Sequence, residues 1–137
     1  MKNIKFSVPN ISNKDINIVE KIIKSGWLAH GKYSHLFESA IKKFTKAKYA
    51  VLLSSCTAGL HLSCLASGFK TGDEVIVPAQ THTATAHAVE YTGAKAVFVD
   101  VEYPSGNISL EKIKKKITKK TKGLIVVHMA GHPCDMK

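Results

Sequence analysis

The most informative segment of the chain is Tyr49-Ala50-Val51-Leu52-Leu53 followed by Ser54-Ser55-Cys56-Thr57-Ala58-Gly59-Leu60-His61. An apolar, strand-like run here leads through a hydroxyl-rich turn into an amphipathic, helix-like run. At such a corner the N–H groups of the first helical turn have no intrahelical partner, and the helix dipole adds partial positive charge. With the Thr57 hydroxyl, the corner is suited to bind a phosphate group. A simple Ser/Thr helix cap gives the same pattern, so both interpretations stand.

Helix-like and strand-like segments alternate on both sides of this corner. Before it, apolar residues at helical spacing predict one helix between Ser12-Asn13 and Ser25-Gly26 and a second from Leu36 to Phe44. From Tyr49 onward the pattern predicts, in chain order, a strand at Tyr49–Leu53, a helix at Thr57–Ala66, a strand at Glu74–Val77, a helix at Thr81–Tyr91, a strand at Ala96–Val99, a helix at Leu110–Ile117 and a strand at Leu124–Val127.

The predicted strands are apolar without in/out alternation, and a helix separates each from the next. This pattern is typical of an α/β fold in which a parallel or mixed sheet carries helices on both faces. Ligands of such sheets bind beyond the carboxyl ends of the strands. Three polar segments fall at these ends, namely Ser54–Thr57, Ala79–His82 and His128–His132. We therefore expect one shared rim, which favours the phosphate interpretation of Thr57.

The composition narrows the class of protein. The chain has 137 residues, is 45% apolar and carries a formal charge of +10 from 20 lysines without any arginine. Because arginine is the residue that reads bases in two-pronged hydrogen bonds, we do not expect sequence-specific nucleic-acid binding. The sequence offers neither a signal peptide nor an apolar run of the ~20 residues that a membrane span needs, so we expect a cytoplasmic protein without membrane partners.

The cysteines and C-terminal histidines suggest metal or nucleophile chemistry only weakly. Cys56, Cys64 and Cys134 are odd in number and lack CxxC spacing, so we expect reduced thiols and no structural zinc site. His128, His132, Cys134 and Asp135 are possible zinc ligands, but their spacing fits no standard pattern. Loop residues that line a cleft are the favoured interpretation, and we expect no metal. No histidine is obviously paired with Cys56 as a base.

Several motifs together carry a resemblance to a known family. They are, in order, Ser25-Gly26 with Gly31, Phe37-Glu38, Ser55-Cys56-Thr57-Ala58 with Leu60-His61, Gly72-Asp73-Glu74-Val75-Ile76-Val77-Pro78, Thr81 through Ala84-Thr85-Ala86, Gly93-Ala94, and Val127-His128 with Gly131. In order and spacing this set resembles the DegT/DnrJ/EryC1/StrS aminotransferases, which use pyridoxal 5′-phosphate (PLP) to aminate keto groups on nucleotide-linked sugars. The resemblance extends from about Val8 to Met136.

The resemblance implies a part of the large domain of the fold-type I PLP-dependent transferases. Residues 1–47 would form an N-terminal helical segment and residues 48–137 an α/β core, both in the N-terminal part of the PLP-binding domain, with the C-terminal remainder absent. The resemblance also implies a nucleotide-sugar substrate, an amino donor such as glutamate, a role in polysaccharide biosynthesis and a homodimer when the protein is full length.

The resemblance also assigns residues to the cofactor. Cys56, Thr57 and Ala58 match the phosphate-binding turn, with cysteine where the family usually has glycine. His82 matches the position of an aromatic ring that lies against the pyridine of the cofactor. Trp27, in the loop Gly26–Gly31, is a candidate substrate contact, although a tryptophan that anchors this loop to the core explains its presence as well.

No catalytic residue can be named in this sequence. The chemistry requires a lysine that forms a Schiff base and an acidic residue at the pyridine nitrogen. In the family both follow the segment that matches Val127-His128, and none of the 20 lysines stands in a matching context. We therefore expect the 137-residue chain to lack transaminase activity by itself. The alternative is a non-catalytic module that keeps the fold and binds a phosphate-bearing ligand or a protein partner.

Overall fold

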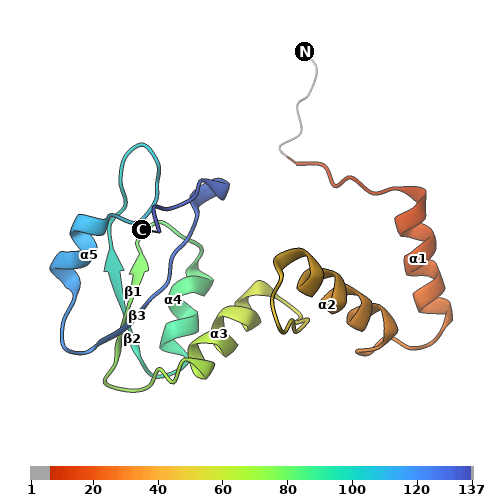
Figure 1. Ribbon diagram of the computed structural model, residues 1–137, viewed down its shortest axis with the longest axis horizontal. Helices are drawn as coiled ribbons and strands as arrows, with labels where there is room; N and C mark the ends of the chain where they lie inside the picture. Colours follow the sequence, from red (N-terminus) through yellow and green to blue (C-terminus); the bar gives the residue numbers. More distant parts are fainter. Residues whose placement is uncertain (1–6, 137) are drawn as a thin grey trace, which may run out of the picture. The chain divides into compact units, whose positions relative to one another are not determined.

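The computed structural model describes residues 7–136, and its backbone divides into two compact units, Met1–Leu52 and Leu53–Lys137. The first unit contains helices α1 (Asn13–Lys24) and α2 (Lys32–Thr45), as the helical spacing predicted (Figure 1). The second unit contains α3 (Cys56–Ala66), β1 (Glu74–Pro78), α4 (Thr83–Glu90), β2 (Lys95–Val99), α5 (Leu110–Lys116), β3 (Thr121–Leu124) and a short 3₁₀ helix, η1 (Met129–Gly131).

The ends of the first two helices follow from local chemistry. Ser12 caps α1, because its Oγ accepts a hydrogen bond from the N–H of Asp15 at 3.3 Å. The Asp15 carboxylate accepts in return from the N–H of Ser12 at 2.8 Å, which completes a capping box. α2 ends at Lys46, which adopts the left-handed conformation typical of a helix C-terminus, with φ 59°.

The sheet is parallel, and its three strands lie in the order β2-β1-β3. Side chains of β1 alternate between two cores. Val75 and Val77 contribute to one core, and Ile76 packs with Val99 and Ile113 in the other. Because helices cover both faces, the predicted α/β architecture is confirmed (Figure 1).

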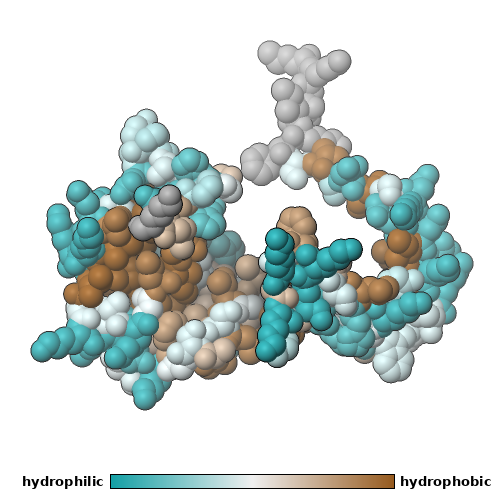
Figure 2. Space-filling view, in the orientation of Figure 1, coloured by the Kyte–Doolittle hydropathy of each residue, from teal (hydrophilic) through white to brown (hydrophobic). Residues whose placement is uncertain are grey.

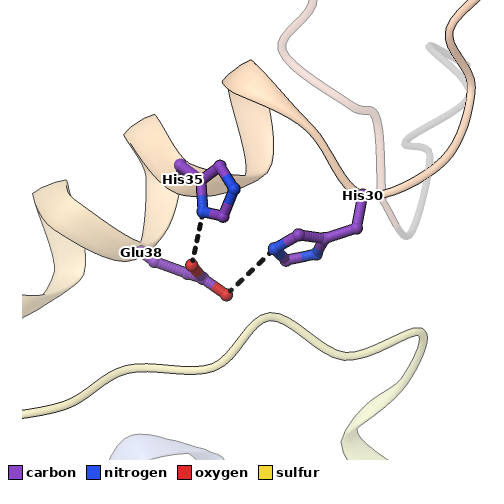
Figure 3. Close-up of side chains that lie close together, drawn as sticks. All are labelled: His30, His35 and Glu38. Atoms are coloured by element: carbon purple, nitrogen blue, oxygen red, sulfur yellow. Dashed lines mark ion pairs between the residues drawn. The ribbon is translucent and has the colours of Figure 1, made fainter.

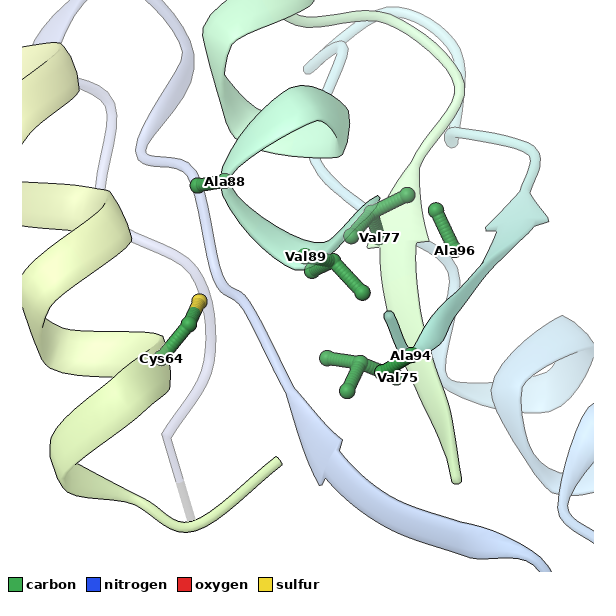
Figure 4. Packing of buried hydrophobic residues seen from close by; sticks show 7 residues of the cluster. All are labelled: Cys64, Val75, Val77, Ala88, Val89, Ala94 and Ala96. Atoms are coloured by element: carbon green, nitrogen blue, oxygen red, sulfur yellow. The ribbon is translucent and has the colours of Figure 1, made fainter. Parts of the chain in front are cut away.

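The larger core is built from small side chains of α3, α4 and the first two strands. Figure 4 shows Val89 of α4 directed toward the valines of β1, whereas Ala88 lies on the side of α4 that faces Cys64 of α3. Its buried members are Cys64, Val75, Val77, Ala88, Val89, Ala94 and Ala96. Such small residues let α4 approach the sheet closely, which fixes the position of the loop between β1 and α4.

Two strand predictions were wrong in detail. Tyr49–Leu53 forms no strand in the described chain; the N–H of Leu52 instead donates to the Glu38 carboxylate at 2.9 Å. The strand predicted at Leu124–Val127 is displaced, because β3 covers Thr121–Leu124 and its pairing extends only by the bond from the Ile125 N–H to the Ile76 carbonyl. The two apolar runs also differ in burial. Tyr49, Val51, Leu52 and Leu53 are exposed, whereas Ile125, Val126 and Val127 are partly buried and line a cavity.

The surface of the sheet-containing unit is partly apolar. Figure 2 shows apolar residues gathered on its visible face. Side chains of this unit that are at least about half exposed include Leu62, Tyr91, Phe98 and Leu110.

Within residues 7–136, no helix is both long enough and apolar enough to cross a membrane.

Candidate functional site

A cavity of about 810 Å³ lies at the carboxyl ends of β1 and β3, where ligands of parallel sheets bind. It brings together residues from all three polar segments that the sequence placed at this rim. Its lining consists of Cys56, Thr57, Leu60, Gln80, Thr81, His82, Ala84, Thr85, Ile125, Val126, Val127, His128, Met129 and Ala130. The volume is sufficient for a cofactor-sized molecule.

The N-terminus of α3 supplies free hydrogen-bond donors to this cavity. Ser55 is the cap residue, and its Oγ accepts from the N–H of Ala58 at 3.1 Å. Within the described part of the chain, the N–H groups of Cys56 and Thr57 have no hydrogen-bond partner. These two N–H groups and the Thr57 hydroxyl form an anion-binding corner. Ala58 does not line the cavity, and its N–H is already used by the cap.

His82 also lines the cavity and directly precedes α4. It is the N-cap residue, and its Nδ1 accepts a hydrogen bond from the N–H of Ala84 at 3.1 Å. In the neutral imidazole this bond places the proton on Nε2. The ring is therefore fixed by the helix that it caps.

The loop that follows β3 is held in place by Asn107, a residue that the sequence did not indicate. Asn107 is buried, and its Oδ1 accepts from the N–H of Met129 at 3.0 Å. Its Nδ2 donates to the carbonyls of His132 and Pro133, each at 3.2 Å. The signal available in the sequence was an asparagine directly after the Ser105-Gly106 turn, a position where asparagine commonly bonds backbone groups.

The C-terminal histidine and cysteine residues do not gather around a metal position. The Nδ1 of His128 accepts from the backbone N–H of Cys134 at 3.1 Å, and the Cys134 thiol donates to the Val127 carbonyl at 3.4 Å. Among the described residues, the group of potential ligands whose donor atoms converge is instead His30, His35 and Glu38.

Trp27 lies in the first unit, where it anchors its own loop. Its Nε1 donates to the His30 carbonyl at 3.2 Å, and its ring packs so closely on Gly31 that a Cβ there would lie 2.6 Å from Nε1. Trp27 is 64% exposed, so the indole braces its own loop and does not anchor that loop to a core, as the alternative interpretation had expected. The substrate contact stays a prediction.

Comparison with known proteins relates the whole described chain to one family. The profile of the DegT/DnrJ/EryC1/StrS aminotransferase family matches residues 9–137. An uncharacterised protein from Methanocaldococcus jannaschii is 43% identical over 128 residues, which are 93% of this chain and 33% of that protein. GDP-perosamine synthase from Escherichia coli O157:H7 is 40% identical over 138 residues, 100% of this chain and 38% of that enzyme.

Solved structures show the same relationship. The PLP form of Spr1654 from Streptococcus pneumoniae, assigned as a sugar aminotransferase, superposes with a TM-score of 0.91 at 36% identity, over 97% of this chain and 34% of that chain. The present chain thus spans about a third of the length of the curated relatives that it matches.

Proposed function

Because the chain belongs to the DegT/DnrJ/EryC1/StrS aminotransferase family, a PLP-dependent family, we propose that it binds PLP in the 810 Å³ cavity and serves the amination of nucleotide-linked keto sugars. The single observation that carries this proposal is that the unpaired N–H groups and the fixed imidazole line the same cavity.

The phosphate of the cofactor fits the N-terminus of α3. Cys56 and Thr57 offer two N–H groups, Thr57 adds a hydroxyl donor, and the lining holds no Asp or Glu that would repel an anion. Donors at a helix N-terminus are the usual partners of phosphate groups. The cysteine at position 56 leaves these N–H groups accessible, so its replacement of the usual glycine is compatible with binding.

The ring of the cofactor fits the remaining walls. The hydrogen bond from Ala84 to Nδ1 of His82 restricts rotation of the imidazole, which would hold a stacked ring in one orientation. Leu60 and the segment Ile125–Val127 supply apolar surface that excludes water from the other side. When bound, PLP supplies an electron sink for chemistry at the substrate carbon.

The residues that line the cavity can bind and orient the cofactor, but they include no lysine that could carry it. None of its lining residues is a lysine or a carboxylate, although the chain contains 20 lysines. Amine transfer requires a lysine that carries the cofactor and moves a proton. We propose that this lysine is contributed from outside the 137 residues and that the 137-residue chain alone does not transaminate.

Our proposals for the substrate class, the cellular location and the assembly rest on membership of the family. A relative named for the synthesis of a GDP-linked sugar supports a nucleotide-linked keto sugar as acceptor. We propose glutamate as the amino donor, a homodimer as the assembly of the intact protein, and the cytoplasm as its location. Amination of a keto sugar by the 137-residue chain with glutamate and PLP would contradict the proposed division of labour.

Binding of pyridoxamine 5′-phosphate tests the cofactor site directly, because this amine form has no aldehyde that could react with the 20 lysines. Thr57→Val removes one donor to the phosphate without changing side-chain size, so calorimetric affinity should fall about tenfold or more. The matched control is Thr83→Val, at an exposed threonine outside the cavity lining, which should bind like the wild type. Equal loss in both variants, or in neither, would contradict the proposal.

A further inference from the structure

Three side chains of the first unit converge at a position that the proposed function does not use. His35 and Glu38 lie three residues apart on α2, so they share one helix face, and His30 approaches from the preceding loop (Figure 3). Their ligand atoms all lie within 4.8 Å of one another. We propose that His30, His35 and Glu38 bind a divalent transition-metal ion of the zinc class.

The two Glu38 contacts are longer than direct hydrogen bonds and close to the spacing of ligands that share one ion, while the full set of ligand atoms, within 4.8 Å, must contract for an ion to bind all three. The Glu38 carboxylate lies 3.7 Å from Nε2 of His30 and 3.4 Å from Nδ1 of His35. A charge-assisted N–H···O bond would measure about 2.7–2.9 Å. Ligand atoms around a tetrahedral zinc ion, with bonds of about 2.0–2.1 Å, lie about 3.3 Å apart.

The carboxylate is held in position independently of the histidines. Its Oε1 accepts the N–H of Leu52 at 2.9 Å, and its side chain is only 16% exposed. This backbone hydrogen bond is the largest cause that lowers the pKa of Glu38, with smaller contributions from His30 and His35. Such an outer hydrogen bond orients a metal-binding carboxylate and favours its ionised form.

The loop that carries His30 is fixed as well. The indole of Trp27 donates to the His30 carbonyl, and the absence of a side chain at Gly31 lets the indole approach. His35 and Glu38 are therefore held by α2, and Glu38 also by its hydrogen bond to Leu52. His30 is held by the loop that Trp27 braces. Such prior arrangement lowers the entropic cost of binding an ion.

The donor set selects the class of ion. Two imidazole nitrogens and one carboxylate oxygen suit zinc and its neighbours, whereas calcium and magnesium prefer oxygen ligands alone. The histidine side chains are 48% and 69% exposed, so an ion can enter from solvent. Three protein ligands leave a coordination position for water.

The test is a calorimetric titration of the tag-free, chelator-treated 137-residue chain with zinc chloride, repeated by absorption spectroscopy with cobalt. We expect saturable binding and a cobalt spectrum of low coordination number. His35→Asn and Glu38→Gln should each weaken binding about tenfold or more. Glu38→Gln keeps an acceptor for the Leu52 N–H, and circular dichroism verifies that each variant is folded.

Two matched controls test potential zinc ligands outside this site. His87→Asn removes a histidine of α4, and Cys134→Ser removes a thiol of the C-terminal loop; both should bind zinc like the wild type. Absence of saturable binding, or weakening by the controls but not by His35→Asn and Glu38→Gln, would overturn the site. Neither result depends on whether the other unit binds the cofactor.

Discussion

His82 caps α4, because its Nδ1 accepts a hydrogen bond from the N–H of Ala84 at 3.1 Å. The same residue lines the cavity. Two substitutions can separate these roles. Asparagine is among the best N-cap residues, whereas alanine is a poor one.

His82→Ala should lower the free energy of unfolding by about 1 kcal/mol through the lost cap. His82→Asn should retain most of this stability. Both variants should lose affinity for pyridoxamine 5′-phosphate, because both lack the ring. Urea unfolding and calorimetry would measure the two effects. Full cofactor affinity in His82→Asn would contradict a role for the ring in binding.

Asn107→Ala should destabilise the protein by about 1–3 kcal/mol, since it removes hydrogen bonds from a buried side chain and leaves backbone groups unsatisfied. The amide proton of Met129, whose acceptor is Asn107 Oδ1, should also exchange faster with solvent. Hydrogen exchange followed by NMR measures this directly. Unchanged exchange at Met129 would contradict the proposed bracing of the cavity loop.

Ile76→Ala should cost about 2–5 kcal/mol, because Ile76 is 1% exposed and sits between Val99 and Ile113 on one face of the sheet. Leu62→Ala, at a side chain of α3 that is 49% exposed, should change stability by about 0.5 kcal/mol or less. Denaturant midpoints measured in parallel test the comparison. Similar losses in both variants would contradict the assignment of the core.

Gly31→Ala should displace the indole of Trp27, since the added Cβ would lie 2.6 Å from its Nε1. The chain has a single tryptophan, so its indole N–H gives one NMR signal that should shift as the bond to the His30 carbonyl is lost. Zinc affinity should fall in the same variant. An unshifted indole signal would contradict the bracing of this loop.

Glu38 should titrate below its ordinary pKa of 4.5, because the Leu52 N–H stabilises the carboxylate. With a lowered folded-state pKa, its contribution to stability is fully present above about pH 4.5 and is lost as the pH falls through the lowered value. Carboxyl NMR shifts recorded with a metal chelator measure the midpoint. A midpoint at or above 4.5 would contradict this prediction.

The sequence was sufficient to predict the parallel α/β core, because apolar strands separated by helices have few other arrangements. It also predicted that Thr57, His82 and His128 would share a cavity, since the carboxyl ends of parallel strands meet at one edge.

The sequence could not predict three other features. Tyr49–Leu53 has the composition of a strand, but strand formation depends on a pairing partner, and local pattern carries no information on pairing. The bracing by Asn107 joins residues more than 20 positions apart. The convergence of His30 on His35 and Glu38 depends on the path of a loop, although the spacing of His35 and Glu38 on one helix face was a readable signal.

The most direct test of the cofactor site compares pyridoxamine 5′-phosphate with pyridoxamine, which differs only in lacking the phosphate. If Cys56 and Thr57 bind the phosphate, the phosphorylated form should bind the 137-residue chain about tenfold more tightly or better, and inorganic phosphate should compete with it. Equal affinities for the two compounds, with no competition by phosphate, would contradict the central claim.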